Sequence, residues 1–452
     1  MESFPRPEDM RSIAGVLSAA GLSLEDMEEG GGGPVLFFSG GSAIKDIVRA
    51  LADLTPSSIH VLTTFDSGGS SAELRRTFKL PGIGDLRLRL VSLADYSDPA
   101  VARACRLFEQ RFPARGERDF LLAEWEKLLS GTHPWLEGLS AEFTEMTLSA
   151  LSGLNRIMPA DFDLRGAALG NLILAADYLA GESRSLRATL ERFSVRFKAR
   201  GLILPVCEEA ANLAVILDSG RIISGQHRFT GKGEVRGRAE TGRNGRSSGQ
   251  RQGRLRERIR KLFYCFGALP EDRPGEEETL PIRLECSPEL PGLLRKAAVI
   301  CYPPGSFYSS VLANIQLAGV GRAVTASPGH KIYIPNPGPD PETLGLTLRD
   351  EVEEVLRALL EDAPGRRPDE ALNYLLIDGS AGIYNGGVPV EWCRKRGIEI
   401  IDYNFTRPAG PGENFPPADP VRSSLFLYLL ARSRKFPAAG GQSQPSGGCL
   451  KR

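Results

Sequence analysis

The segment from residue 34 to residue 65 constrains the fold most, because strand and helix patterns alternate within it over a short length. Residues 34–38 (PVLFF) read as a buried strand, residues 39–42 as a tight turn, and residues 59–65 (IHVLTTF) as a second strand. Between the strands, apolar residues recur at helical spacing: Ile44, Ile47, Val48, Leu51 and Leu54. A strand–helix–strand unit of about 30 residues implies a parallel sheet covered by helices.

The same alternation returns later in the chain. Residues 100–200 read mostly as helix, and strands are expected at 201–206 and 213–217. Four more strand patterns follow from about residue 280: AAVICYPPGS, HKIYIPNPG, LNYLLIDG and IEIIDYNF. The sequence therefore predicts an α/β fold with a mostly parallel sheet and a helical insertion at about 100–200.

Composition excludes several classes of protein. The chain has 56 Lys+Arg against 56 Asp+Glu, with 41% hydrophobic and 25% charged residues, which is ordinary for a globular protein and not for a disordered one. No run reaches the roughly 18 apolar residues that a membrane-spanning helix needs. Acidic residues precede the apolar stretch 12–22, whereas a signal peptide begins with positive charge. We therefore expect a cytoplasmic protein with no membrane partner.

Cysteine and histidine give no metal or disulfide signal. The seven cysteines show no C-x-x-C spacing, and the four histidines form no H-x-x-x-H pair. A hard cation such as Mg²⁺, held by carboxylates and ligand phosphates, fits this sequence better than zinc does.

The chain divides into three parts by composition. Residues 1–33 hold an acidic predicted helix and a glycine joint, residues 34–435 form the α/β domain, and residues 436–452 resemble a linker. Within the domain, residues 232–261 carry eleven Lys/Arg, three Glu and no aromatic residue. We expect a disordered surface insertion there. Its net charge of +8 could attract an acidic partner, but the lack of aromatic residues argues against sequence-specific nucleic-acid binding.

Two glycine-rich turns open helices directly after neighbouring strands. Residues 39–42 comprise Ser39, Gly40, Gly41 and Ser42, and a second turn holds Gly68, Gly69, Ser70 and Ser71. Glycine allows a tight turn, and a helix N-terminus offers unpaired N–H groups to an anion. Because ligands bind at the carboxyl ends of parallel strands, the pair of turns predicts a phosphate site.

Asp66 stands at the end of the second strand, before Gly68. It is placed to hold Mg²⁺ or to accept a proton, and the alternative is that it satisfies the N–H groups of its own turn. Ser70 and Glu73 fit the S-x-x-E capping box, so we expect a helix to begin near Ser71.

Polar residues in three later segments complete the candidate site. In residues 80–95, Arg87 could clamp a phosphate or pair with Asp85. In residues 164–176, Gly170 and Asn171 lie inside an apolar helical pattern, where Asn171 either ties the helix to a loop or contacts a ligand. Residues 301–315 give a third strand, glycine turn and helix, with these candidates: Gly305, Ser306, Tyr308 and Asn314.

These motifs, in this order, resemble the CofD superfamily, which contains the 2-phospho-L-lactate transferases and the YvcK-type gluconeogenesis factors. Over residues 34–347 the matching segments are FSGGSA, TTFDSGGSSAELRR, LPGIGDLRLRLVSLAD, GAALGNLILAA, PPGSFYSSVLANI and the stretch from Glu342 to Thr347. Within that superfamily, the motifs best resemble those of the subfamily of CofD-like proteins of the GAK system. The resemblance implies a Rossmann-like fold with helices on both faces of the sheet, and it carries Arg75 into the ligand site.

The resemblance implies two alternative functions. The transferases move a phospholactyl-type group from a guanosine diphosphate-linked donor to an alcohol, which would use magnesium and Asp66 as catalytic residue. The YvcK-type relatives bind nucleotide sugars and act as regulatory sensors without catalysis. Phe65 stands where those relatives have the first Asp of a pair, which agrees with reduced chemistry. The expected partner is a nucleotide or nucleotide sugar, and the sequence leaves the base, the acceptor and a homo-oligomer open.

Overall fold

The structure is a computed structural model of the 452-residue chain. It describes residues 32–230, 255–266, 281–411 and 413–433. The acidic stretch over residues 1–29 and the tail from residue 436 lie outside these ranges, so the predictions made for them stay predictions.

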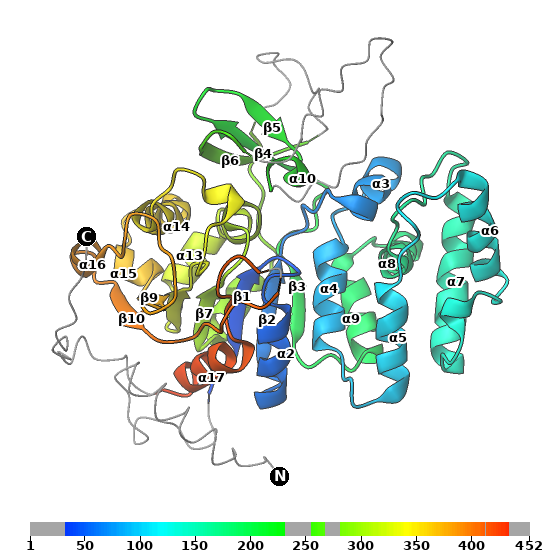
Figure 1. The fold of residues 1–452 in the computed structure, drawn as a ribbon, viewed down its shortest axis with the longest axis horizontal. Coiled ribbons are helices and arrows are strands. Elements are labelled where there is room, and N and C mark those ends of the chain that lie inside the picture. The colour runs from blue at the N-terminus through cyan, green and yellow to red at the C-terminus, as the bar shows by residue number, and fades with distance from the viewer. Residues whose placement is uncertain (1–31, 231–254, 267–280, 412, 434–452) are drawn as a thin grey trace.

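A seven-stranded parallel sheet forms the centre of the fold (Figure 1). Its order is β10-β9-β8-β7-β1-β2-β3, and every neighbouring pair is parallel. The strands are β1 (Val35–Ser39), β2 (Ser58–Leu62), β3 (Leu202–Pro205), β7 (Val299–Tyr302), β8 (His330–Tyr333), β9 (Tyr374–Ile377) and β10 (Glu399–Asp402). The predicted α/β fold with a mostly parallel sheet is confirmed.

Two hydrophobic cores lie on opposite faces of this sheet. Along β1, Val35 and Phe37 enter one core, and Leu36 and Phe38 enter the other, as strand alternation requires. The first core is covered by α2 (Lys45–Leu54), α4 (Gly84–Leu93) and α17 (Pro420–Ala431). The second is covered by α11 (Leu290–Lys296), α13 (Val320–Thr325) and α14 (Leu348–Asp362). A strand buried on both faces is continuously apolar, which is why residues 34–38 read as a strand.

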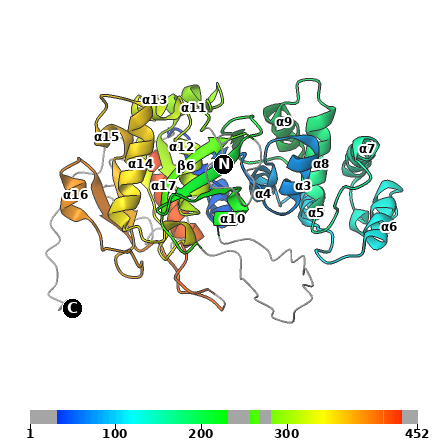
Figure 2. The same cartoon turned by 90° about the horizontal axis from the view of Figure 1, so that it is seen from above.

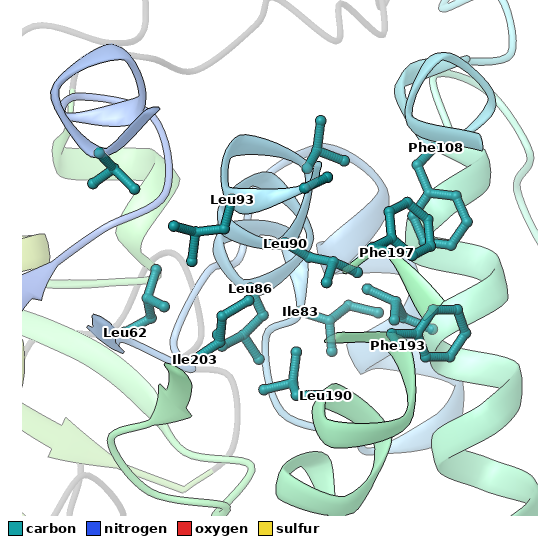
Figure 3. Close-up of a cluster of buried hydrophobic side chains, with 14 of the residues drawn as sticks. Leu62, Ile83, Leu86, Leu90, Leu93, Phe108, Leu190, Phe193, Phe197 and Ile203 are labelled. Carbon is teal, nitrogen blue, oxygen red and sulfur yellow. The ribbon is translucent and has the colours of Figure 1, made fainter. Parts of the chain in front are cut away.

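A helical lobe extends the first core to one side, as Figure 2 shows from above. It comprises α5 (Pro99–Glu109), α6 (Arg118–Leu129), α7 (Ala141–Ile157), α8 (Leu169–Ala180) and α9 (Leu186–Arg196). In Figure 3, Leu86 and Leu90 of α4 lie between the sheet residue Ile203 and the aromatic rings of the lobe. Phe108 and Phe197 meet edge-on with ring centroids 4.7 Å apart. The helical insertion predicted at about 100–200 is therefore confirmed.

A second, three-stranded antiparallel sheet stands beside α3 (Gly69–Phe78), at the top of Figure 1. Its order is β5-β4-β6. The strands are β4 (Asn212–Leu217), β5 (Ile222–Ser224) and β6 (Ile259–Cys265), and the short helix α10 (Gln226–Phe229) follows β5. The expected strand at 213–217 therefore exists, but it belongs to this separate sheet.

Strand β6 corrects the boundary of the basic insertion, which the sequence placed at 232–261. Residues 231–254 lie outside the described part, but β6 already begins at Ile259, opposite Leu217 of β4. Ile259 and Leu262 are buried, whereas Arg260 and Lys261 between them are exposed. The sequence did not reveal this short strand, because its exposed residues Arg260 and Lys261 continue the basic composition of the insertion.

The remaining helices are short. They are η2 (Pro134–Leu136), the π-helical turn η3 (Phe307–Leu312), α12 (Ala313–Ile315), η4 (Pro341–Thr343), α15 (Pro368–Ala371) and α16 (Val390–Arg394). Over the described ranges, no helix has the length and apolar character needed to cross a bilayer.

Candidate functional site

The sheet reverses its winding direction between β1 and β7. From β1 the chain proceeds outward to β2 and β3, and it later returns to β7 on the other side of β1. The turns after β1 and β7 therefore leave adjacent strands at the same edge of the sheet. In open parallel sheets this point is where ligands bind.

The turn after β1 presents a row of unbonded backbone N–H groups. Among the described residues, no acceptor is found for the N–H groups of residues 40–44, and no side chain caps α2 at Ile44. Ser42 and Ala43 are exposed. Consecutive N–H groups at a helix N-terminus carry partial positive charge and suit an anion.

Gly40 and Gly41 are required by close packing under this turn. A Cβ at Gly40 would lie 2.5 Å from Ser310 Oγ, and one at Gly41 would lie 2.7 Å from Asp85 Cα. Side chains at either position would force the turn away from α4 and η3. The sequence predicts that these glycines form a tight turn that admits an anion; the structure adds that the protein's own Ser310 and Asp85 approach them closely, and anion binding stays a prediction.

Two buried side chains hold the carbonyl side of the turn. Arg89 Nη2 donates to Ser39 Oγ at 3.2 Å and to the Gly40 carbonyl at 3.0 Å. Asn314 Nδ2 donates to the carbonyls of Ser39 and Ser310, at 3.1 and 2.6 Å. Because Ser39 is itself buried, its hydroxyl serves Arg89 inside the protein rather than facing the open edge.

Asp66 is bonded within its own turn. Its Oδ1 accepts from the N–H of Gly68 at 3.0 Å, and its Oδ2 accepts from Ser71 Oγ at 2.5 Å. The alternative that Asp66 satisfies its own turn is thus realised. Each carboxylate oxygen has a second lone pair, so these bonds do not prevent a further contact.

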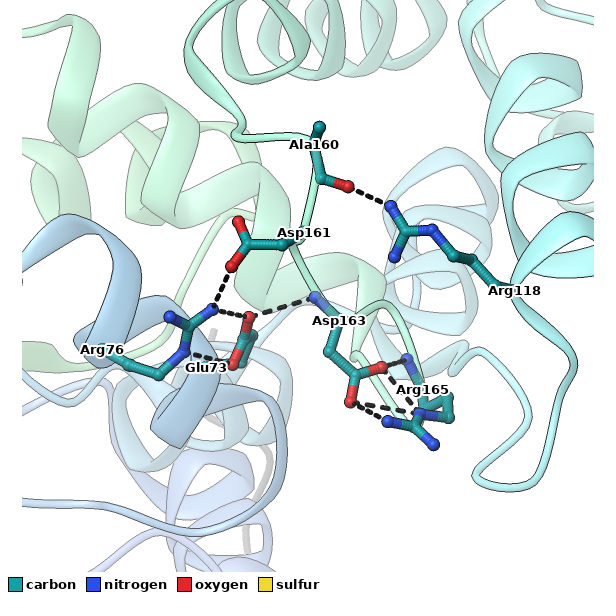
Figure 4. A network of polar contacts seen from close by, with 7 residues as sticks. All are labelled: Glu73, Arg76, Arg118, Ala160, Asp161, Asp163 and Arg165. Carbon is teal, nitrogen blue, oxygen red and sulfur yellow. Dashed lines mark hydrogen bonds and ion pairs between the residues drawn. The ribbon is translucent and has the colours of Figure 1, made fainter.

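The expected capping box at Ser70 and Glu73 does not form. Helix α3 begins at Gly69, its N-cap is Gly68, and none of the described side chains caps it. Figure 4 shows Glu73 turned instead toward Arg76 and the backbone of Asp163. Glu73 Oε1 accepts a hydrogen bond from the Asp163 N–H at 3.0 Å. Tertiary contacts with the 160–165 loop therefore replaced the local cap.

Arg87 is the centre of a chain of buried polar contacts, as far as the described residues extend. Its Nε donates to Asn171 Oδ1 at 2.9 Å, and Asn171 Nδ2 donates to Ser70 Oγ at 2.9 Å. Burial lowers the pKa of the Arg87 guanidinium to about 10. No described carboxylate forms an ion pair with it, so the predicted Asp85 pair is absent. Asp85 instead accepts from Thr63 Oγ1 at 3.1 Å.

Helix α8 begins later than the sequence indicated. It starts at Leu169, so Gly170 and Asn171 occupy its first turn rather than its interior. A Cβ at Gly170 would lie 2.7 Å from the Phe108 carbonyl and 2.8 Å from Arg87 Cδ. Gly170 therefore makes room for Arg87, and Asn171 ties the helix to the Ser70 loop.

The third predicted turn, after β7, is filled by the protein's own carboxylates. Glu342 Oε2 accepts the N–H groups of Tyr308 and Ser309, at 2.8 and 2.9 Å, and Asp340 accepts that of Phe307 at 2.8 Å. Gly305 N–H donates to Asn336 at 2.9 Å. The turn lies at the expected edge, with Ser306 as N-cap of η3, but acidic side chains occupy the N–H groups that an anion would use.

Two further contacts join the second sheet to the Asp66 turn. His227 Nδ1 lies 3.0 Å from Ser67 Oγ. Arg75 Nη2 donates to the Ala211 carbonyl and to Asn212 Oδ1, at 2.6 and 2.7 Å. Arg75 therefore links α3 to β4 rather than facing the open edge. Sequence reasoning missed His227, because an isolated histidine far along the chain gives no spacing signal.

A magnesium site would depend mainly on ligand oxygens. The described residues contain no group of three or more His, Cys, Asp or Glu suited to a metal ion. Phe65, in place of a second carboxylate, is fully buried and packs on Tyr264 with ring centroids 5.1 Å apart. Asp66 alone fits Mg²⁺ only where phosphates complete the coordination shell, as they often do for this ion.

The family is shown by comparison with known proteins. Residues 35–386 match the family described as 2-phospho-L-lactate transferase CofD. The chain belongs to the CofD family. It is 25% identical over 322 residues to the gluconeogenesis factor of Bacillus subtilis, covering 71% of this chain and 73% of that protein. It is 26% identical over 328 residues to the putative gluconeogenesis factor of Thermotoga maritima, covering 72% and 75%.

Solved structures support the same CofD-family fold. A crystal structure of protein BH3568 from Bacillus halodurans matches with a TM-score of 0.55 and 21% identity, over 88% of this chain and all of that one. A second structure of that protein, described as a member of the UPF0052 family, matches with a TM-score of 0.56 and 22% identity, over 87% and 98%. The predicted Rossmann-like CofD fold is thus confirmed.

Gly84 tests how the Asp66 turn is held. A Cβ at Gly84 would lie 2.2 Å from Asp66 Oδ2 and 2.9 Å from Ser71 Oγ, whereas one at Gly68 meets nothing closer than 3.5 Å. We predict that Gly84→Ala lowers the free energy of unfolding by about 1–3 kcal/mol through overpacking. Gly68→Ala, on the other side of Asp66, should change it by less than about 1 kcal/mol. Equal effects in urea titrations would contradict this packing.

Glu351 on α14 gives a prediction for pH. Tyr333 at the end of β8 donates to its Oε2 at 2.7 Å. Burial raises the pKa of Glu351 to about 7. A raised pKa means that the folded state binds the proton more tightly than the unfolded state, so this group's contribution to stability is lost as pH rises through about 7.

The wild type should lose this stability between pH 5 and pH 8, and Glu351→Gln, which cannot ionise, should not. The variant should therefore be more stable than the wild type at pH 8, with a smaller difference between the two proteins at pH 5. Thermal unfolding at both values measures this. Glu353→Gln changes a side chain on the same helix that is 45% exposed, and it should leave the pH profile unchanged. A profile of Glu351→Gln that coincides with the wild type would contradict the prediction.

Proposed function

We propose that this CofD-family protein binds a nucleoside-diphosphate-linked ligand, with its phosphates at the N–H groups of residues 40–44. The observation that carries the proposal is the uncapped N-terminus of α2 at the switch point of the sheet. A helix N-terminus without a protein cap leaves hydrogen-bond donors that an anion can satisfy.

Arg89 of α4 contacts the turn from inside the protein and forms no ion pair with a carboxylate among the described residues. The Asp85 carboxylate borders Gly40 and Gly41 on the same side, so the positive charge that favours an anionic ligand here is that of Arg89 and of the helix N-terminus. At the neighbouring turn after β7, Glu342 and Asp340 already take the N–H groups. The proposed phosphate position is therefore the β1 turn, and α3 offers the N–H groups of Gly69 and Ser70 nearby.

Group transfer is the first candidate activity at this site. A hydroxyl of the acceptor would attack the donor phosphorus, the nucleoside monophosphate would leave, and the hydroxyl proton would pass to Asp66. The Gly68 and Ser71 hydrogen bonds would keep the Asp66 carboxylate oriented during this step. Magnesium, where bound, would neutralise phosphate charge beside Asp66.

Ligand sensing without catalysis is the second candidate activity. Phe65 favours it, because a buried aromatic ring replaces the carboxylate that would complete a metal pair. Similarity to proteins named gluconeogenesis factors agrees with this alternative without deciding it. Placement in the GAK system and formation of a homo-oligomer stay predictions.

Ser42 separates anion binding from folding. Its side chain is exposed in the turn. A carboxylate at this place would satisfy the helix N-terminus and repel phosphate. We predict that Ser42→Asp folds with unchanged or higher thermal stability but loses the melting-temperature increase that UDP-sugars or guanosine diphosphate compounds give the wild type.

The matched control is Ser42→Asn, whose side chain has nearly the same size as the aspartate of Ser42→Asp but carries no charge. It should keep the ligand-induced increase. If Ser42→Asp responds to every nucleotide as the wild type does, the phosphates do not bind at the β1 turn. If no nucleotide shifts the wild type, the binding proposal itself is wrong.

Asp66 separates the two activities. Asp66→Asn keeps the acceptor for the Gly68 N–H and removes the charge. As a transferase, the variant should fold normally, lose magnesium-dependent ligand binding, and release no GMP from a guanosine diphosphate-linked donor. As a sensor, it should bind somewhat more weakly, with no magnesium effect to lose. Calorimetry with and without Mg²⁺, together with a GMP assay, measures both.

Asp66→Ala provides the control for a purely structural role. It removes both turn hydrogen bonds, which should cost about 1–3 kcal/mol of stability. If Asp66→Ala is destabilised while Asp66→Asn retains magnesium-dependent activity, Asp66 is a turn residue, and the catalytic assignment is wrong.

A further inference from the structure

Arg89 is a fully buried arginine with an incomplete set of partners. Its side chain is 0% exposed. Within the part of the chain that the structure describes, only its Nη2 finds acceptors, namely Ser39 Oγ and the Gly40 carbonyl. Nε and Nη1 are buried, and no acceptor is found for either within the described ranges. An arginine carries five N–H donors, so most of its hydrogen-bonding capacity is unused.

The charge of Arg89 is also uncompensated by direct contact. No described carboxylate lies within ion-pair distance of it, and Asp85 acts on it only from further away. The neighbouring His60 is buried against Phe37 and adds no negative charge. Burial lowers the pKa of Arg89 to about 10, which still leaves it charged at neutral pH. A buried charge without a partner is costly to the folded state.

The position of this charge explains why the protein tolerates it. Nη2 donates a hydrogen bond to the Gly40 carbonyl from the buried side of the turn. In a trans peptide the N–H points away from the C=O, so a Gly40 carbonyl held inward turns the N–H of Gly41 outward. No described residue accepts from the N–H groups of residues 40–44. Asn314 holds the Ser39 carbonyl in the same way.

We propose that Arg89 is a positioning residue for the anion, which orients the β1 turn and supplies a buried positive charge beneath the bound phosphates. This inference rests on the proposed function, since it assigns a further residue to the same ligand. It implies a trade-off: the ligand-free protein bears the cost of the buried charge, and the bound oxyanion offsets it.

The test measures ligand-free stability and anion affinity in the same variants. Arg89→Met should melt close to the wild-type temperature without ligand, because removing an unpaired buried charge offsets the two hydrogen bonds lost to Ser39 and Gly40. Its affinity for inorganic pyrophosphate, measured by calorimetry, should fall about 10- to 100-fold, as expected for removing one charge a few ångströms from an anion in a partly buried site. Arg89→Lys keeps the charge and should keep most of the affinity.

Two variants serve as controls. Arg49→Met removes the same charge from an exposed position on α2, next to Tyr96, and should leave pyrophosphate affinity within about two-fold. Arg89→Gln is neutral but can still donate to the Gly40 carbonyl. It replaces Arg89→Met if that variant does not fold.

The outcomes are distinguishable. If the wild type does not bind pyrophosphate or any nucleotide, the proposed function and this inference both fail. If the wild type binds and Arg89→Met or Arg89→Gln binds equally well, Arg89 is structural and only this inference fails. If both neutral variants unfold, or both melt well below the wild type, the claimed cost of the buried charge is wrong.

Discussion

The tight turn between β1 and α2 is the constraint on which the rest of the site depends. Strand β1 lies between the two halves of the sheet, so the chain must leave it abruptly at the switch point. Ser310 and Asp85 fill the space beside Gly40 and Gly41, and no side chain fits there. Arg89 and Asn314 bond the carbonyls of the turn, and none of the described residues accepts from the N–H groups of residues 40–44. The geometry that packs the turn thus also creates its capacity for an anion.

Three turns with similar sequences differ in what satisfies them. No described side chain caps the β1 turn, the Asp66 turn is held by its own carboxylate, and the turn after β7 is capped by Glu342 and Asp340. Carboxylates at a helix N-terminus and a bound phosphate use the same donors. Among the described residues, the turn after β7 is therefore closed by acidic side chains, whereas the start of α2 and the first N–H groups of α3 stay open to an anion.

The fold was predictable, because the sequence patterns of its strands and helices are local. Part of the site was not predictable, since its hydrogen bonds join residues far apart in the sequence. The apolar runs at 34–38 and 59–65 identify buried parallel strands, and the motif order identifies the family. The capping box at Ser70 and Glu73 failed, since Asp163 lies 90 residues from Glu73. Neither the Glu342 cap nor the contact of His227 with Ser67 has any spacing signal. Arg89 reads as one more charge in an amphipathic helix, and only its burial shows otherwise.

Hydrogen–deuterium exchange with mass spectrometry tests the central claim most directly, because it reports on the N–H groups themselves. Saturating pyrophosphate should slow exchange in the peptide that contains residues 40–44. It should leave residues 307–309 unchanged, because Asp340 and Glu342 already bond their N–H groups in the absence of ligand. Unchanged exchange at residues 40–44, or new protection at 307–309, would contradict the account.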